Sequence, residues 1–278
     1  MDNLQPPELD AADQEEWRRQ LTLGTAIRWK RRLRNRIPSN PRCKMCAAPF
    51  AGIGGLVMPM FGHARWPKNP KYCAGCYQAL RASHGGAEVD CSFLFADVRG
   101  STALAERMSS SDFTRLMGRF FDTATSILVD EGAMVDKFVG DEVIGLFIPA
   151  MATDAHPEHA VRAARRLLAA MGHDRPGGPW LPIGIGVNSD IAYVGSVGTG
   201  LDSEMTAMGD AVNLTARLSS HAGAGEVLVP VEAATKAGVA VDDLEHRSLE
   251  LKGKSQPTEV VVLTTASARE MGDVRDGD

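Results

Sequence analysis

The feature that most constrains this chain is the order of apolar runs and helical patterns between residues 91 and 264. The run CSFLFAD predicts a buried strand, and SDFTRLMGRFFDTATSILVDEG follows with apolar residues at helical spacing. AMVDKFVGDEVIGLFI then predicts two strands around a turn, before a helix over 157–171. This order, strand, helix, strand, strand, helix and strand, is ferredoxin-like. We therefore expect an α+β fold, an enlarged ferredoxin-like α/β sandwich.

The remaining elements complete that expectation. LPIGIGVNSDIAYVGSV predicts a second hairpin that turns at residues 188–190. A helix over 211–221, a strand near 226–230, a short helix over 231–237 and a last strand over 257–264 follow.

Charge divides the 278 residues into two parts. The first 90 hold 14 basic and 8 acidic side chains, whereas the rest hold 16 and 27. Such asymmetry predicts two modules with different roles. We expect a disordered segment (1–11), a basic amphipathic helix (12–37) and a small four-cysteine metal module (38–84). The α+β domain (88–265) and a flexible tail (266–278) would follow.

The composition does not favour a membrane or secreted protein. No stretch approaches the ~20 consecutive apolar residues that a spanning helix needs. The N-terminal segment is acidic and polar, whereas a signal peptide is basic and then apolar. We therefore expect a cytoplasmic chain without a transmembrane segment.

Four of the five cysteines form two C-x-x-C pairs, CKMC and CAGC, in the basic part. In a reducing compartment this spacing favours a metal over disulfides. Four thiolates in two pairs suit one tetrahedral, structural Zn²⁺, with an iron–sulfur cluster or a redox pair as the alternative. The predicted zinc ligands are Cys43, Cys46, Cys73 and Cys76. His63, between the pairs, is not needed as a ligand, and Cys91 is expected to be a buried apolar residue.

Two aspartates end or turn predicted strands. Asp97 closes FLFAD and Asp141 lies at the tip of KFVGDE, so a ferredoxin-like sheet brings both carboxylates to one edge. With nucleotide phosphates they would suit Mg²⁺ or Mn²⁺, which prefer oxygen ligands. The small-residue turn after Asp97 would open a helix and offer its N–H groups to phosphate. Taken singly, the two would be a helix cap and an ordinary turn residue.

Asn213 and Arg217 in GDAVNLTAR are four residues apart and therefore share one helix face. An amide beside a guanidinium suits a sugar and a developing phosphorane charge. Without further context, an exposed polar helix face explains the same spacing.

FADVRGST, KFVGDEVIGLF, GDAVNLTAR and LKGKSQPTEV occur in the order and spacing of the class III nucleotidyl cyclase catalytic domain, which the chain resembles over about residues 91–264. The resemblance implies a head-to-tail homodimer that makes cyclic nucleotides, with each active site shared between two chains. Two Mg²⁺ or Mn²⁺ per site would be held by Asp97, the Val98 carbonyl and Asp141. The partner chain would supply Asn213 and Arg217. The phosphate-binding residues would be Gly100, Ser101, Thr102 and Lys252.

The same resemblance points to ATP. Lys137 stands where adenylate cyclases carry a lysine, and Thr206 stands where an Asp, Thr or Ser reads the adenine amino group. A lysine donates to adenine N1, whereas guanine presents an N1–H there. One departure is the loop GTGLDSEMT, which lacks the basic residue that many bacterial relatives carry.

Other functions remain open from sequence. They are a guanylate cyclase, a diguanylate cyclase suggested by VGDEVIGLF, and a catalytically silent cyclase fold in a zinc-module regulator that binds nucleic acid. The basic helix is expected to pack in the dimer with a solvated arginine face. Nucleic acid or anionic lipid would be its alternative partner.

Overall fold

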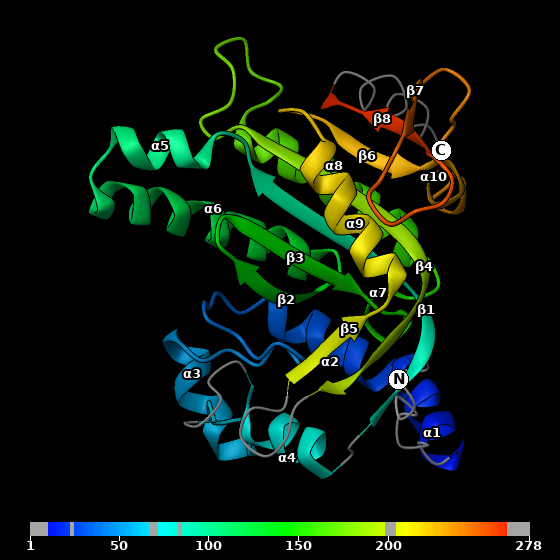
Figure 1. The fold of residues 1–278 in the computed structure, drawn as a ribbon. Coiled ribbons are helices and arrows are strands. Elements are labelled where there is room, and N and C mark those ends of the chain that lie inside the picture. Colours follow the sequence, from blue (N-terminus) through cyan, green and yellow to red (C-terminus); the bar gives the residue numbers. More distant parts are fainter. Residues whose placement is uncertain (1–10, 23–24, 67–71, 83–84, 198–203, 266–278) are drawn as a thin grey trace, which may run out of the picture. The chain divides into compact units, whose positions relative to one another are not determined.

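The computed structural model describes residues 11–22, 25–66, 72–82, 85–197 and 204–265 (Figure 1). The chain forms two compact units. The smaller unit contains residues Met1–Val89 and Ala192–Met208, and the larger unit contains Asp90–Ile191 and Gly209–Asp278. The predicted disordered segment, apart from residue 11, and the predicted tail lie outside the described residues. The predicted domain limits therefore stay predictions.

An eight-stranded sheet confirms the α+β prediction. Its order is β2-β3-β1-β4-β6-β8-β7, and β5 pairs with β4 beside this path. The strands are β1 (Gly85–Val98), β2 (Met134–Val139), β3 (Glu142–Phe147), β4 (Ile183–Val197), β5 (Glu204–Met208), β6 (Val227–Pro230), β7 (Glu245–Leu249) and β8 (Thr258–Leu263).

Helices of the larger unit cover both faces of its strands. These helices are α5 (Ser101–Arg107), α6 (Ser110–Asp130), α7 (Pro149–Ala152), α8 (His156–Met171), α9 (Asp210–His221) and α10 (Val231–Lys236). Because neighbouring strand residues point to opposite faces, Val261 belongs to the core with α6, α8 and α10, whereas Val260 and Val262 pack with α9. The α9 helix therefore packs on the opposite face of the sheet from α6, α8 and α10.

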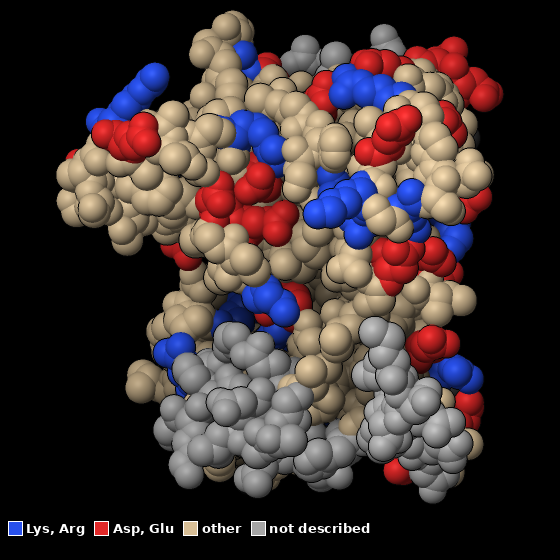
Figure 2. Space-filling view, in the orientation of Figure 1, with Lys and Arg blue, Asp and Glu red and all other residues tan. Residues whose placement is uncertain are grey.

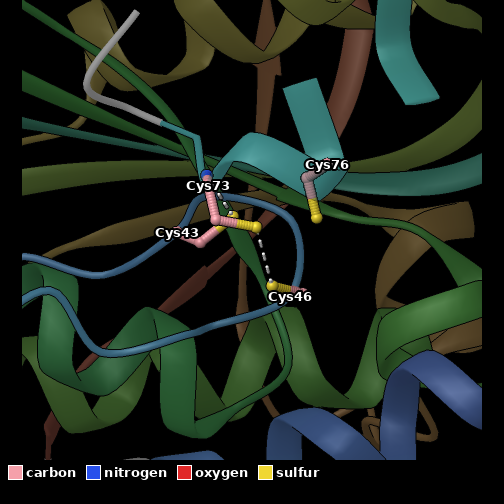
Figure 3. Close-up of side chains that lie close together, drawn as sticks. All are labelled: Cys43, Cys46, Cys73 and Cys76. Carbon is pink, nitrogen blue, oxygen red and sulfur yellow. Dashed lines mark hydrogen bonds between the residues drawn. The ribbon is translucent and has the colours of Figure 1, made fainter. Parts of the chain in front are cut away.

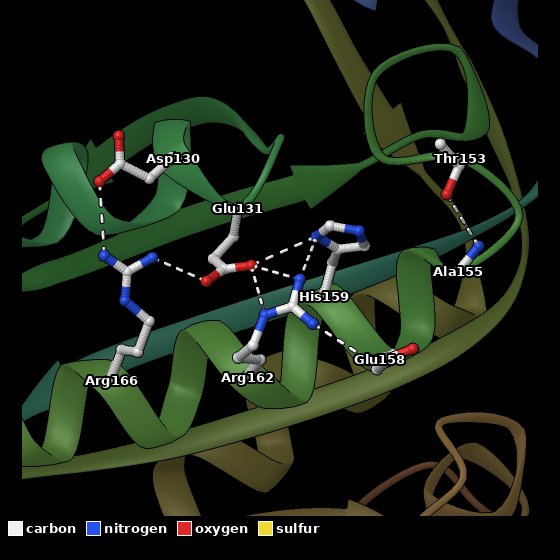
Figure 4. A network of polar contacts seen from close by, with 8 residues as sticks. All are labelled: Asp130, Glu131, Thr153, Ala155, Glu158, His159, Arg162 and Arg166. Atoms are coloured by element: carbon white, nitrogen blue, oxygen red, sulfur yellow. Dashed lines mark hydrogen bonds and ion pairs between the residues drawn. The ribbon is translucent and has the colours of Figure 1, made fainter. Parts of the chain in front are cut away.

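A buried carboxylate ties α6 to α8 (Figure 4). Glu131, just after α6, accepts hydrogen bonds from Arg162 Nε at 2.8 Å and Arg166 Nη1 at 2.7 Å. His159 Nδ1 lies 3.2 Å from the same carboxylate. Burial alone would raise the pKa of Glu131, but its contacts with His159, Arg162 and Arg166 outweigh burial and lower that pKa to about 2.

The prediction of a hairpin at residues 188–190 is wrong, since β4 runs without a turn from Ile183 to Val197. The polar residues there are satisfied inside the fold. Ser189 Oγ lies 2.6 Å from Ser92 Oγ, which lies 2.7 Å from His156 Nδ1, and Asn188 donates to the Ala211 carbonyl. Strand β7, which the sequence analysis missed, has the polar sequence EHRSL.

In the described part of the smaller unit there are five helical segments and the β5 end of the sheet. The segments are α1 (Ala11–Thr22), α2 (Thr25–Asn35), α3 (Gly52–Val57), the 3-10 helix η1 (Met58–Phe61) and α4 (Ala74–Ala82). Two helices therefore occupy the range in which one basic helix was predicted, and residues 23 and 24 between them lie outside the described part. Within the described residues, no helix combines the length and apolar character needed to cross a membrane.

Candidate active site and metal centre

Asp97 and Asp141 lie together at one end of the larger unit's strands. Antiparallel pairing of β1 with β3 puts Asp97 opposite Glu142, the residue that follows Asp141. Burial raises the pKa of Asp97, and the neighbouring Asp141 carboxylate raises it further, against the opposing effect of Arg99. The sequence analysis expected this convergence, which follows from the register of the β1–β3 pair.

Two further charged groups join the aspartates, and the sequence analysis gave neither a role. Arg99 Nη2 donates to Asp97 Oδ2 at 2.6 Å and to the Ser219 carbonyl at 2.9 Å. Ser219 Oγ in turn donates to Glu142 Oε1 at 3.0 Å. Burial, with Asp97 and Asp141 nearby, raises the pKa of Glu142 to about 7. The available signal for Glu142 was its place as the second acid of GDE, directly after Asp141, which the sequence analysis had already singled out.

This group of carboxylates suits divalent cations. Acidic side chains gather over the end of β1 on the face shown in Figure 2, with basic side chains beside them. Burial and then repulsion from neighbouring carboxylates raise the pKa values of Asp97 and Glu142, so the nearby groups of the chain do not offset their negative charge in full. A hard cation with oxygen ligands would relieve that repulsion, so the donor set fits Mg²⁺ or Mn²⁺.

The predicted phosphate-binding turn follows directly. Val98 ends β1, and Gly100 adopts a left-handed conformation, with φ of 72°, just before Ser101 and Thr102 begin α5. Glycine reaches this conformation without the steric cost that a Cβ adds. The turn therefore has the predicted form, and phosphate binding by its residues stays a prediction.

The α9 residues lie on the same unit as the carboxylates. Asn213 is exposed, whereas Arg217 is partly buried and its Nη1 atom has no hydrogen-bond partner among the described residues. A buried donor without a partner is costly in a folded protein, so this guanidinium suits an anionic ligand. Gly253 of the LKGK segment lies beside Arg217. A Cβ atom placed on Gly253 would be 3.4 Å from Arg217 Nη2.

The two LKGK lysines differ. Lys252 is exposed, while Lys254 forms an ion pair with Asp210 at the start of α9. Among the described residues, Lys252 has no ion-pair partner, so its ammonium group is available for the predicted phosphate contact. The contact itself stays a prediction.

The two predicted base-reading residues belong to different units. Lys137 lies on β2 of the larger unit, where it is exposed and its Nζ lies 3.5 Å from Asp136 Oδ2. Thr206 lies on β5 in the smaller unit and is 8% exposed.

The four predicted zinc ligands form one cluster (Figure 3). Cys43 and Cys46 follow α2, whereas Cys73 and Cys76 lie at the start of α4, and all four Sγ atoms lie within 4.8 Å of one another. All four are free thiols, and the Cys46 and Cys73 sulfurs are 3.7 Å apart. The Cys73 N–H donates to Cys43 Sγ at 3.3 Å, an arrangement that also stabilises a thiolate. The cluster can hold one tetrahedral metal ion, whose identity the geometry leaves open.

Two buried arginines contact the CKMC segment of this cluster, which corrects the expected solvated arginine face at these two positions of the basic helix. Arg31 and Arg34 are 4% and 9% exposed. Arg31 donates to the Met45 carbonyl at 2.7 Å and Arg34 to the Cys46 carbonyl at 3.2 Å, so both hold the CKMC backbone. Burial lowers the pKa of Arg31 to about 10, opposed by Cys43, Cys46 and Cys76.

Charge balance explains this burial. A divalent ion with four thiolates carries a net charge of about −2, which two buried guanidinium groups would offset. His63 is not a member of the cluster, but its Nδ1 lies 3.2 Å from Cys73 Sγ and can hydrogen-bond a bound thiolate.

The sheet, the paired aspartates and the α9 residues define a nucleotidyl cyclase domain, and comparison with known proteins agrees. The family model of the "Adenylate and Guanylate cyclase catalytic domain" matches residues 86–264. The chain therefore belongs to this family.

Curated relatives include adenylate cyclases. The chain is 28% identical to "Adenylate cyclase, terminal-differentiation specific" of Dictyostelium discoideum over 61% of its own length and 8% of the relative's. It is 31% identical to "Adenylate cyclase 1" of Rhizobium meliloti over 45% of its length and 20% of the relative's. The chain thus spans only a small part of these relatives.

Solved structures of both cyclase types share the fold. The adenylyl cyclase CyaB from P. aeruginosa superposes with a TM-score of 0.57 at 26% identity, covering 64% of this chain and 95% of that one. The guanylyl cyclase Cya2 gives 0.59 at 23% identity, covering 64% and 93%. The fold is therefore that of a nucleotidyl cyclase, and the choice between ATP and GTP rests on individual residues.

Proposed function

We propose that this protein is an adenylate cyclase that converts ATP to 3′,5′-cyclic AMP and pyrophosphate in active sites shared across a head-to-tail homodimer. The observation that carries the proposal is the pair of carboxylates, Asp97 and Asp141, at the end of β1 in a chain of the cyclase family. The partly buried Arg217 guanidinium, with an unpartnered Nη1, provides the cation for a developing phosphorane charge.

Each residue has a role in this proposal. Bound divalent cations would lower the pKa of the ribose 3′-OH and offset charge on the phosphates. Asp97, the Val98 carbonyl and Asp141 would hold those cations, while the turn at 100–102 would donate N–H groups to phosphate oxygens. Lys252 would contact the terminal phosphates. From the partner chain, Asn213 would orient the ribose and Arg217 would stabilise the transition state.

Two residues support ATP as the substrate. Lys137 can donate to the unprotonated N1 of adenine, whereas guanine N1–H would oppose a second donor. Thr206 carries a hydroxyl that can accept from the adenine amino group. The proposal takes both residues to be the ones that read the base, as their places in the family's sequence pattern suggest.

Product analysis tests the reaction and the base together. The purified chain is incubated with ATP or GTP in Mn²⁺, and cyclic nucleotides are separated by chromatography. Cyclic AMP from ATP that disappears in Asp97→Ala is the expected result. Cyclic GMP as the main product would identify the chain as a guanylate cyclase instead. If neither cyclic AMP nor cyclic GMP forms, the catalytically silent alternative is favoured.

Mixing inactive chains tests the shared site. Asp141→Ala and Arg217→Ala damage residues that come from different chains of one site, so a mixed dimer keeps one intact site. We expect each variant to be inactive alone and the mixture to recover part of the activity. Absence of any recovery, with dimers demonstrated by light scattering, would contradict the shared-site arrangement.

We also propose that the four cysteines hold one structural Zn²⁺ per chain. The convergence of their sulfurs and the two buried arginines support this assignment. Elemental analysis of the purified chain should find one zinc. Iron with acid-labile sulfide would indicate a cluster instead.

A further inference from the structure

The outer edge of β5 is covered by the cysteine module, residues 38–84. Met205 on β5 pairs with Ser196 of β4. Its backbone N–H donates to Tyr72 Oη at 3.1 Å, and its carbonyl accepts from Lys44 Nζ at 3.3 Å. Both backbone groups of Met205 therefore face away from β4 and toward the module. A sheet edge that would otherwise present unpaired groups is closed by two side chains.

The next residue of β5 is Thr206, the proposed reader of the adenine amino group. In an antiparallel pair the backbone groups of successive residues point alternately to the partner strand and away from it. Since those of Met205 point outward, those of Thr206 point to Gly195, its partner on β4. The position of Thr206 is therefore set from both sides of its strand.

The β4 side is held by a close glycine contact. A Cβ on Gly195 would lie 2.6 Å from Gly86 Cα at the beginning of β1, closer than side chains allow. Strands β1 and β4 thus meet without side chains between them at this level. Thr206 thus pairs with Gly195 on one side, and its neighbour Met205 is held on the other side by Tyr72 and Lys44.

Those two side chains are neighbours of the metal ligands in sequence. Tyr72 precedes Cys73, and Lys44 follows Cys43. The Cys73 N–H donates to Cys43 Sγ, so the two segments also contact each other. Tyr72 is 0% exposed, which leaves its ring no freedom independent of the module. A metal ion held by both pairs would therefore fix Tyr72 and Lys44 together.

We propose that Tyr72 and Lys44 are positioning residues for substrate choice: the metal-bound cysteine module holds Met205 and so sets where Thr206 stands. The role in base choice rests on the proposed cyclase function and the role of the metal rests on the proposed zinc site, whereas the two hydrogen bonds that hold Met205 depend on neither. In this proposal the module positions a residue of the substrate site, in addition to folding around its own metal ion.

Tyr72→Phe tests the brace, because it removes the hydroxyl and keeps the ring. The full chain is measured by amide hydrogen exchange, zinc content and initial rates with ATP and GTP. We expect one zinc per chain as before, exchange of the Met205 amide about fivefold faster, and a ratio of ATP to GTP turnover several-fold lower, as loss of one hydrogen bond implies. Tyr77→Phe, an equally buried tyrosine that stacks on Trp66, is the matched control.

Metal removal from the wild-type chain provides the second arm. After zinc chelation and removal of the chelator, exchange over residues 204–208 should accelerate while protection in α8 is kept. Lys44→Met replaces the first variant if Tyr72→Phe does not fold. Unchanged Met205 exchange in the folded variant and in the zinc-free chain would overturn the brace.

The outcomes separate the two proposals. Faster exchange with an unchanged ratio of ATP to GTP turnover would refute the link to substrate choice. Absence of cyclase activity in the wild-type chain would refute the proposed function, and the exchange data would still decide the brace.

Discussion

Replacing Glu131 by glutamine perturbs the most heavily paired carboxylate of the larger unit (Figure 4). The side chain is 7% exposed and contacts Arg162 and Arg166 within 2.8 Å. Its pKa falls from 4.5 to about 2, which at ~1.4 kcal/mol per unit corresponds to about 3 kcal/mol of stabilisation by the ionised form. Because both arginines are 42% exposed, solvent screening reduces this figure to about 2 kcal/mol.

The sign of the pH dependence follows from the lowered pKa. Glu131 is ionised in both folded and unfolded chains above pH 4.5, so its full contribution is present there. As pH falls from 4.5 through about 2, the unfolded chain takes up the proton first and the contribution is lost. We therefore expect Glu131→Gln to be about 2 kcal/mol less stable at pH 7, with a gap that narrows below pH 4.5.

Urea unfolding followed by circular dichroism at pH 7, 4.5 and 3 measures that gap. Asp130→Asn is the matched control, because Asp130 is half-exposed and 3.4 Å from Arg166. We expect the control to change stability by less than ~0.5 kcal/mol. A gap that stays constant from pH 7 to 3, or an equal cost for both variants, would refute the reasoning.

Three further predictions follow from other parts of the chain. Burial raises the pKa of Glu142 to about 7, so ionisation of this side chain costs stability from pH 4.5 upward. Without added Mg²⁺ or Mn²⁺, Glu142→Gln should therefore raise the melting temperature at pH 8 and leave it unchanged at pH 4.5. Gly186→Ala would place a Cβ 2.5 Å from the backbone of α9 and should cost about 1–3 kcal/mol in urea unfolding. Gly145→Ala, which meets a movable leucine side chain, should cost less. Arg31→Met should weaken zinc binding about tenfold in chelator competition, whereas the exposed Arg32→Met should not; equal affinities would contradict the charge-balance argument.

Much of the fold was predictable because its signals are local. Apolar periodicity located α6, α8 and α9 and the β2–β3 hairpin within a few residues. The error at residues 188–190 arose because Asn and Ser usually mark turns, and their satisfaction by distant partners such as Ser92 leaves no local trace. Strand β7 contains Leu249 as its single apolar residue and forms by pairing with β8, which periodicity does not reveal.

The site was predictable only in part. Asp97 and Asp141 were expected to converge because one closes an apolar strand and the other lies at the tip of the neighbouring hairpin, and the cysteine spacing indicated the metal cluster. The burial of Arg31 depends on carbonyls more than ten residues away, and a run of basic residues ordinarily indicates a solvated face. Likewise, the contact of Tyr72 with Met205 joins segments 133 residues apart, beyond any sequence pattern.

The contacts of Tyr72 and Lys44 with β5 determine where this chain can be divided into fragments. A fragment cut at residue 86, where the family match begins, would keep Asp97, Asp141 and α9 but leave the backbone groups of Met205 without their partners. An uncovered strand edge invites pairing with other chains, so such a fragment is expected to aggregate or to lose substrate discrimination. A chimaera in which the first 84 residues are replaced by a segment without counterparts of Tyr72 and Lys44 would leave the same backbone groups of Met205 unpaired.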